Sequence, residues 1–375
     1  MADAVIKGLE GVMAASSALC DLDGENGRLA YRGYDIGDLV AGGATFEEVT
    51  YLLWQGELPT PHQLQAFKSE LTGERNIRPE VVRAMRLYPN WAAPMAALRA
   101  AVAMQGLYDA EAEDDSLEAN RRKAVRLTAK LPTMVATYHR IRSGQGELLP
   151  RADLDHGENF LHMLSGRIPD PAIARALDAS LVLYAEHELN ASTFTARCVA
   201  STRSDLYSAV TAALGALKGP LHGGAGEAVM RTLEEIGTLE NVEPFVKKAL
   251  AEKRRFMGFG HRVYRAGDPR ATILRAMAED VCRRTGQGRW YEMSRRLHEV
   301  VNGEKGLIPN VDFYSASLWL AMGIPVDIFV PVIAIARVAG WTAHLLEQYA
   351  DNRLIRPRAA YTGPARRRYV ALDRR

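Results

Sequence analysis

The chain has 375 residues, of which 47% are hydrophobic and 25% are charged, so it can bury a large core and form two structural domains. Its formal net charge of +2 argues against a protein that binds nucleic acid over its whole surface. The cysteines Cys20, Cys198 and Cys282 are far apart and odd in number, which argues against a disulfide framework or a metal or redox motif, so we expect them to be reduced.

The N-terminal segment predicts the compartment and a small β-structure. Its first residues lack the basic region and long apolar run of a secretory signal, and they are not Arg-rich like a transit peptide, so we expect a cytoplasmic protein. Residues 17–23 and 28–32 flank the turn sequence Gly24-Glu25-Asn26-Gly27, which predicts a hairpin. Helical periodicity dominates beyond it. The predicted fold class is therefore all-α, with one small N-terminal β-hairpin.

Several helices can be placed from spacing and start signals. Apolar residues recur at helical intervals over 173–184, and Ser204-Asp205 is a start signal for a helix with apolar positions from Leu206 to Leu217. Residues 111–122 are rich in Glu, Asp and Arg and indicate an exposed connection or helix face. The apolar stretch 328–346 has membrane length, but it contains a proline, an arginine, a glycine and a histidine. We therefore predict a buried helix and no membrane association.

His222 is the first candidate for chemistry. It precedes Gly223-Gly224 and a predicted helix from Ala225 to Ile236, and paired glycines permit close approach of the backbone to a ligand. The nearby helix N-terminus disfavours imidazolium. A neutral imidazole can donate a hydrogen bond to a developing enolate oxygen without giving up its proton. The alternative is a histidine in a turn, satisfied by backbone groups.

His261 lies in a glycine-rich loop ahead of a helix that we predict to begin at Asp268-Pro269. A dinucleotide-binding turn is a competing interpretation of Gly258-Phe259-Gly260, but the spacing and the lack of a preceding Val/Ile strand argue against it. Arg270 falls in the first turn of the predicted helix, where a cation opposes the helix dipole by roughly 0.3 to 1 kcal/mol. We therefore expect an anion beside Arg270.

Asp312 has two interpretations. It could simply cap a helix predicted from Phe313 to Met322. Alternatively, a carboxylate that stays ionised in an apolar cleft lined by Val311 and Phe313 could act as a general base, provided that a partner such as His222 raises the acidity of the substrate. The functional interpretation requires both residues together.

Arg337 is the only Lys, Arg, Asp or Glu between Asp327 and Glu347. A buried guanidinium without an anion is costly in free energy, so we expect either an internal carboxylate or the carboxylate of a bound ligand to pair with it. The guanidinium fork suits bidentate carboxylate binding. The tail 353–375 contains eight arginines and one acid, Asp373, which is typical of a solvated basic arm.

Over almost its full length the chain resembles the citrate synthase family. The segments around His222, His261 and Asp312 look like the family's three catalytic motifs, in order and with suitable separation, and the resemblance extends to 8–12, 31–36 and 356–363. It implies an all-helical, two-domain fold with a small domain of residues 224–323 closing over the substrates. The large domain would comprise 1–223 and 324–375. Because the N-terminus is shorter than in hexameric, NADH-inhibited members, a plain homodimer is expected.

The resemblance also implies the reaction and its residues. Asp312 would remove a proton from the methyl group of acetyl-CoA, His222 would hydrogen-bond the enol or enolate, and His261 would polarise and protonate the oxaloacetate carbonyl. Hydrolysis of citryl-CoA would then give citrate and CoA. The remaining assignments are His187, Arg270 and Arg337 for oxaloacetate, Arg356 from the second subunit, and Arg262 and Arg265 for the CoA phosphates. We expect no metal, since His187-Glu188 lacks a second histidine four residues later, and no tightly bound cofactor.

Two alternatives to citrate synthase stay open at this point. A 2-methylcitrate synthase would share the motifs and differ mainly in accepting propionyl-CoA, a distinction of one methylene worth about 1 to 3 kcal/mol in an apolar pocket. A noncatalytic helical protein could instead bind CoA, or bind nucleic acid through its basic tail. The intact trio of His222, His261 and Asp312 argues against the former, and the near-neutral charge and absent recognition motif argue against the latter.

Overall fold

The computed structural model describes residues 5–375, and α-helices make up most of the regular structure in this part of the chain. The first half contains α1 (Ile36–Ala41), α2 (Phe46–Gln55), α3 (Pro61–Gly73), α4 (Pro79–Arg86), α5 (Pro94–Gly106), α6 (Leu117–Arg142), α7 (His156–Ser165) and α8 (Pro171–Tyr184). The second half contains α9 (Ala191–Ala200), α10 (Leu206–Leu217), α11 (Ala225–Ile236), α12 (Val242–Ala251), α13 (Pro269–Arg284), α14 (Gly288–Lys305), α15 (Val311–Ala321) and α16 (Phe329–Ala350). The predicted all-α class is confirmed.

The predicted hairpin is present and carries one extra strand. Strands β1 (Cys20–Asp23) and β2 (Arg28–Tyr31) pair antiparallel, with Cys20 opposite Tyr31, and the short β3 (Tyr34–Asp35) pairs with the other edge of β2. Tyr31 is fully buried, and its hydroxyl donates a hydrogen bond to the Glu186 carbonyl at 2.9 Å. The hairpin is thereby fixed to the connection between α8 and α9, which contains His187.

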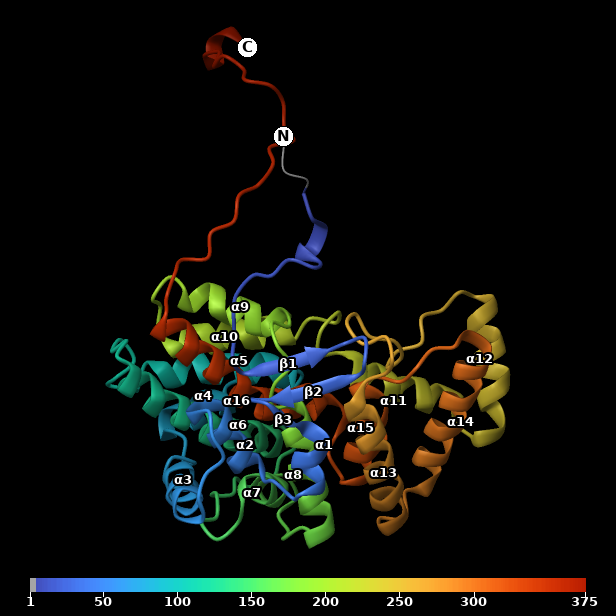
Figure 1. The fold of residues 1–375 in the computed structure, drawn as a ribbon. Coiled ribbons are helices and arrows are strands. Elements are labelled where there is room, and N and C mark those ends of the chain that lie inside the picture. The colour runs from blue at the N-terminus through green and yellow to red at the C-terminus, as the bar shows by residue number, and fades with distance from the viewer. Residues whose placement is uncertain (1–4) are drawn as a thin grey trace.

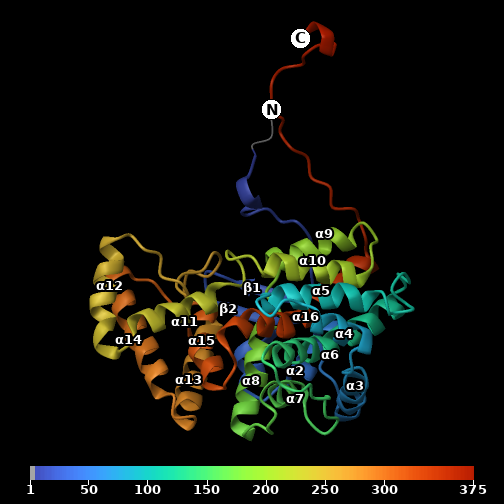
Figure 2. The same ribbon diagram turned by 180° about the vertical axis from the view of Figure 1, so that it is seen from behind.

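Helix α16 forms the centre of the larger group of helices. It packs against α2, α5, α6, α8, α9 and α10 (Figures 1 and 2). The stretch Val326–Ala350 is long and apolar enough to cross a membrane, but 89% of its most apolar window is buried within the protein. The sequence-based prediction of a buried helix at 328–346 is therefore confirmed, and Arg337 lies within a core helix.

Helices α11 to α15 gather on one side of the molecule, at the right of Figure 1 and the left of Figure 2. Within this group α13 packs against α15, and α12 packs against α14. Residues 224–323, predicted to form the small domain, contain all five helices. The division into two closing domains stays a prediction.

Both terminal segments leave the body on the same side (Figures 1 and 2). Residues 5–13 and 356–375 are exposed throughout, and they carry large apolar side chains that contact no core. The exposed apolar residues of these segments are Val5, Ile6, Leu9, Val12, Met13, Tyr361, Tyr369, Val370 and Leu372.

Most predicted helix starts agree with the structure, and one does not. Helix α13 begins at Pro269 after the N-cap Asp268, and α11 spans the predicted Ala225–Ile236. The helix after Pro309 begins at Val311, because Asn310 is the N-cap and its Oδ1 accepts from the Asp312 backbone N–H at 3.1 Å. The interpretation of Asp312 as a helix cap is therefore wrong. The segment 111–122 divides between an irregular connection and the start of α6.

Candidate active site

Asp312 lies in the first turn of α15, between the buried residues Val311 and Phe313. The Tyr184 hydroxyl donates a hydrogen bond to Asp312 Oδ1 at 2.9 Å, and Ser315 Oγ lies 2.9 Å from the same hydroxyl. Burial raises the pKa of Asp312 to about 6, and the hydrogen bond from Tyr184 opposes that rise. The carboxyl group is therefore ionised at neutral pH yet more basic than an ordinary aspartate, as a general base requires.

His222 lies in the turn between α10 and α11. Burial, followed by the positive field of Arg337, lowers its pKa to about 4. The expected neutral state is confirmed, but burial and a nearby cation cause it rather than the helix dipole. Gly223 allows this turn to pack closely, since a Cβ there would lie 2.5 Å from the Leu217 carbonyl oxygen.

The contacts of His222 also define which ring nitrogen carries the proton. Its Nε2 atom accepts from the Ser192 backbone N–H at 3.3 Å and lies 2.8 Å from Ser192 Oγ. A ring nitrogen that accepts from a backbone N–H has no proton, so the hydrogen-bond network assigns the proton to Nδ1. Trp341 Nε1 donates to Ser192 Oγ at 3.1 Å and holds this hydroxyl in place. His222 thus retains Nδ1–H as a free donor.

His261 has the opposite tautomer. Its Nδ1 atom accepts from the backbone N–H groups of Val263 at 3.0 Å and Tyr264 at 3.1 Å, which leaves the proton on Nε2. Burial and the field of Arg270 lower the pKa of His261 to about 4. His261 is therefore a neutral donor through Nε2.

His187, in the connection between α8 and α9, lies beside His261. The ring centroids are 5.3 Å apart in an edge-to-face arrangement, and His187 Nε2 lies 3.2 Å from the Tyr264 hydroxyl. Burial, then the fields of Arg270 and Arg337, lower the pKa of His187 well below its ordinary value. Two predicted residues from separate segments, His187 and His261, therefore lie side by side.

Arg270 is buried and already has an anionic partner. Its Nε and Nη2 atoms donate to the two carboxylate oxygens of Asp268 at 2.9 and 2.8 Å. The anion expected beside Arg270 is therefore present, and it is the internal side chain of Asp268. Asp268 Oδ2 also accepts from the Val311 backbone N–H at 2.9 Å, which ties the start of α13 to that of α15.

Arg337 differs from Arg270 because no carboxylate in residues 5–375 forms an ion pair with it. It is 5% exposed, and its Nε atom donates to the Tyr184 carbonyl at 2.6 Å. Burial lowers its pKa, and the field of Glu186 is the largest opposing influence. Tyr184 therefore links two predicted site residues, with its carbonyl on Arg337 and its hydroxyl on Asp312.

Comparison with known proteins decides the family. The family model described as "Citrate synthase, C-terminal domain" matches residues 8–358. The chain belongs to the citrate synthase family.

Relatives and solved structures agree with this assignment. The chain is 50% identical to citrate synthase 2 of Bacillus subtilis, covering 98% of this chain and 99% of the relative. It is 43% identical to a 2-methylcitrate synthase of Mycobacterium tuberculosis, covering 96% and 91%. A Thermoplasma acidophilum citrate synthase, solved as a ternary complex with carboxymethyl coenzyme A and oxaloacetate, superimposes with a TM-score of 0.93 at 35% identity, covering 99% of each chain.

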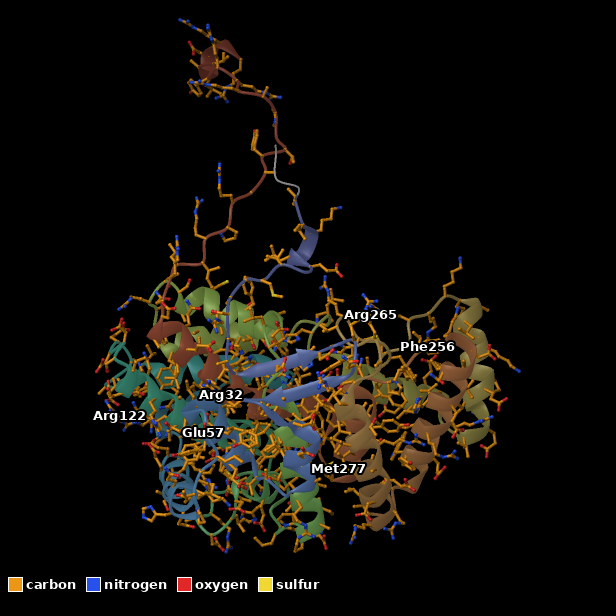
Figure 3. All side chains as sticks on the ribbon, viewed as in Figure 1. Arg32, Glu57, Arg122, Phe256, Arg265 and Met277 are labelled. Carbon is orange, nitrogen blue, oxygen red and sulfur yellow. The ribbon has the colours of Figure 1, made fainter. Side chains whose placement is uncertain are left out.

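Three arginines assigned from the citrate synthase resemblance make no side-chain hydrogen bond or ion pair with the site residues described above. Arg356 is exposed in the C-terminal segment that leaves the body, and the single chain does not bring it to the other residues. Arg262 and Arg265 lie on the exposed loop between α12 and α13, where Figure 3 labels Arg265, and they pair with Glu10 and Glu25. Their roles stay predictions.

Sequence reasoning missed the residues that hold this citrate synthase site in place. These are Tyr184, Ser192, Asp268, Tyr264 and Ser315. Asp268 was recognised only as a helix cap, although a carboxylate two residues before Arg270 was a visible signal for the pair. Ser192 and Tyr184 gave no such signal, because their partners lie 30 and 128 residues away.

The pKa of Asp312 predicts an acid limb in the pH profile. We expect kcat/KM at low acetyl-CoA to fall below about pH 6, because the base is then protonated in the free enzyme. Because the pKa values of His222 and His261 are about 4, these two groups should not titrate between pH 5 and 8. Initial rates from pH 5 to 8 test this expectation. A flat profile down to pH 5 would show that Asp312 is not the titrating base.

Proposed function

We propose that this protein condenses acetyl-CoA with oxaloacetate and hydrolyses citryl-CoA to citrate and CoA, as an acyltransferase that turns the acyl group into an alkyl group. The single observation that carries the proposal is a half-buried group of residues in which the basic carboxylate of Asp312 and the neutral donors His222 and His261 are linked through Tyr184, Arg337 and Arg270. The family membership and the substrates named for the Thermoplasma relative support it.

The first step forms a carbon nucleophile. Asp312 takes a methyl proton of acetyl-CoA, and the electron pair of the C–H bond moves toward the thioester carbonyl to form the enolate. His222 donates a hydrogen bond from Nδ1–H to the thioester oxygen, where negative charge develops. Its Nε2 atom stays occupied by Ser192, so this donor has a fixed direction.

The second step forms the carbon–carbon bond. The enolate carbon attacks the carbonyl carbon of oxaloacetate, and the carbonyl oxygen receives a proton from His261 Nε2. Two backbone N–H groups on Nδ1 hold the His261 ring in the required tautomer. Asp312 then releases the methyl proton to solvent, solvent returns a proton to His261 Nε2, and water hydrolyses the thioester of citryl-CoA to give citrate and CoA.

Oxaloacetate would be held by His187, Arg270 and Arg337, with Arg356 of the second subunit completing the set. The unpaired fork of Arg337 suits one substrate carboxylate directly. Arg270 keeps Asp268 as its partner, so it would offer only the donors that Asp268 leaves free.

The finer features of the proposal concern assembly. We propose a cytoplasmic homodimer whose exposed terminal segments pack on the partner, and a small domain of residues 224–323 that closes after oxaloacetate binds. Closure keeps water from the thioester until both substrates are in place. CoA would lie along residues 256–265, with Arg262 and Arg265 near its phosphates. No tightly bound cofactor is required.

Replacing Arg337 with leucine should raise the oxaloacetate requirement by 10-fold or more, since a charge-assisted bond worth about 1.5 to 3 kcal/mol is lost. The variant should still fold, although loss of the cation that balances the buried Glu186 should lower its melting temperature. The KM for oxaloacetate and the melting temperature measure the two effects. Arg142→Leu, which removes a peripheral pair with Asp327, is the control. A large loss of stability with unchanged KM would contradict the clamp.

The alternative substrate is propionyl-CoA, because a 2-methylcitrate synthase is also among the relatives. One extra methylene changes binding by about 1 to 3 kcal/mol in an apolar pocket, so the preference can be measured. Initial rates with both thioesters at saturating oxaloacetate test it. We expect a higher kcat/KM for acetyl-CoA, and the reverse order would make the chain a 2-methylcitrate synthase.

A further inference from the structure

Glu186 is a fully buried carboxylate beside the candidate site, and none of the steps above uses it. It immediately precedes His187 in the connection between α8 and α9. Its Oε1 atom lies 2.9 Å from His344 Nε2, and its Oε2 atom is buried with no hydrogen-bond partner. An unsatisfied buried carboxylate oxygen is costly, so its retention needs a reason.

His344 does not neutralise the charge of Glu186. Its Nδ1 atom lies 2.9 Å from the Arg197 Nη1 group, and an arginine can only donate. The Nδ1 atom must therefore accept, so the His344 ring is neutral and carries its proton on Nε2. That proton is donated to Glu186 Oε1. The pair is a charged carboxylate with a neutral donor, and one negative charge stays buried.

Arg337 is the cation that this negative charge faces. The field of Glu186 is the main influence that offsets the lowering of the Arg337 pKa by burial. Both are on or against α16, where the backbone at Gly340 comes so close that a Cβ would lie 2.2 Å from Glu186 Oε2. Gly340 lies one turn after Arg337 and one turn before His344.

The two charged groups are nevertheless held apart. The Arg337 side chain is anchored through Nε to the Tyr184 carbonyl at 2.6 Å, and Glu186 is anchored to His344, two turns further along α16. No ion pair between Glu186 and Arg337 is present within 4.0 Å. This contrasts with Arg270, whose donors are engaged by Asp268. Glu186 thus balances Arg337 without occupying its fork.

We infer that Glu186 is a positioning residue that balances the charge of Arg337 in the empty site and leaves its fork free for a carboxylate of oxaloacetate. The inference rests on the proposed role of Arg337 as the substrate clamp. The buried negative charge of Glu186 stabilises the ligand-free protein, because it balances the charge of Arg337. The same charge weakens oxaloacetate binding, because it repels the substrate carboxylate that binds to Arg337.

The variant Glu186→Gln tests the inference, because the amide oxygen can still accept from His344 while the charge is removed. We expect oxaloacetate to bind more tightly, on the order of tenfold, and the ligand-free protein to melt at a lower temperature. The kcat should stay within a few fold. Calorimetric titration of oxaloacetate, thermal melts and initial rates give the three quantities. Glu347→Gln, which alters a carboxylate paired with Arg197 on the same helix, is the control and should not tighten binding.

A double-mutant cycle with Arg337→Leu separates this effect from general disturbance. In the Arg337→Leu protein, Glu186→Gln should no longer tighten oxaloacetate binding and should raise the melting temperature, because it then removes an unbalanced buried charge. Equal effects of Glu186→Gln in both proteins, or weaker binding in both, would overturn the inference. If Glu186→Gln alone does not fold, recovery of folding in the double variant supports the inference, and failure to recover contradicts it.

The proposed function is tested separately in the same experiment. A parent protein that binds no oxaloacetate, or an Arg337→Leu variant that binds it as well as the parent, would contradict the substrate clamp itself. The third possible result is that the parent binds oxaloacetate, that Arg337→Leu abolishes this binding, and that Glu186→Gln has the same effect with and without Arg337. That result would overturn only the role of Glu186.

Discussion

Replacing Asp312 with asparagine should lower kcat by about 100- to 10,000-fold, because the amide keeps the size of the side chain but cannot accept the methyl proton. The Tyr184 hydroxyl can still donate to the amide oxygen, so the local geometry should be kept. Oxaloacetate affinity should change little, since the substrate clamp is built from other residues. Steady-state rates and oxaloacetate titration on the purified variant measure both quantities.

The stability of the same variant serves as the folding control. Because the pKa of Asp312 rises from 3.8 to about 6 in the folded protein, its protonated form is favoured there. The contribution to stability is full below pH 3.8 and is lost as the pH rises through about 6. At pH 7 the charge costs up to about 3 kcal/mol, so Asp312→Asn should melt no lower than the parent.

A surface control completes the Asp312 experiment. Asp280→Asn alters an exposed carboxylate that pairs with Arg283 and Arg284, and it should leave kcat unchanged. If Asp312→Asn turns over acetyl-CoA within a few fold of the parent, Asp312 is not the base. A lower melting temperature at pH 7 would show that the carboxylate is structural instead.

Replacing Arg356 with alanine should nearly abolish activity in the dimer of that variant, because one oxaloacetate carboxylate loses a charge-assisted partner worth about 1.5 to 3 kcal/mol or more. The position of Arg356 motivates this expectation. It is exposed in a segment that leaves its own body, so it is free to reach a partner's site. Arg366→Ala, in the same segment, is the matched control and should remain active.

Mixing two inactive variants then tests whether the site is shared between subunits. In a dimer of one Arg356→Ala chain and one Asp312→Asn chain, one site has both intact residues and the other has both defects. Random mixing makes about half of the dimers mixed, so activity should recover to roughly a quarter of parental sites. Differential tags confirm the mixed dimer. No recovery in confirmed mixed dimers would place Arg356 in its own chain's site or outside it.

The sequence predicted those features that depend on local signals. Asp268 and Pro269 marked the start of α13, and the turn at residues 24–27 marked the hairpin, since capping and turn residues act within a few positions. Helix α16 was also correctly predicted as buried, because a charge and a proline in an apolar stretch exclude a lipid-facing span.

The hydrogen-bonded pairs of the candidate site depend on tertiary contacts, which the sequence does not reveal. Nothing local to Asp312 indicates that Tyr184 donates to its carboxylate, and nothing local to Ser192 indicates its contact with His222. The histidine tautomers follow only from those partners. Arg270 shows the opposite error, because its partner was two residues away but was interpreted only as a cap. The spacing of residues in the sequence identified Asp312 and the histidines as candidates. Their tertiary contacts determine which atoms carry protons and which way the hydrogen-bond donors point.

The most direct test of the proposed reaction follows the methyl carbon of acetyl-CoA. We suggest labelling that methyl group with a heavy carbon isotope, adding oxaloacetate and the purified protein, and identifying the labelled product by magnetic resonance while free CoA is quantified. The proposed mechanism predicts that the label appears in a methylene group of citrate, in equal amount to the CoA released, and that Asp312→Asn forms neither product at the parental rate. Label found in acetate, with CoA released but no citrate, would contradict carbon–carbon bond formation at this site.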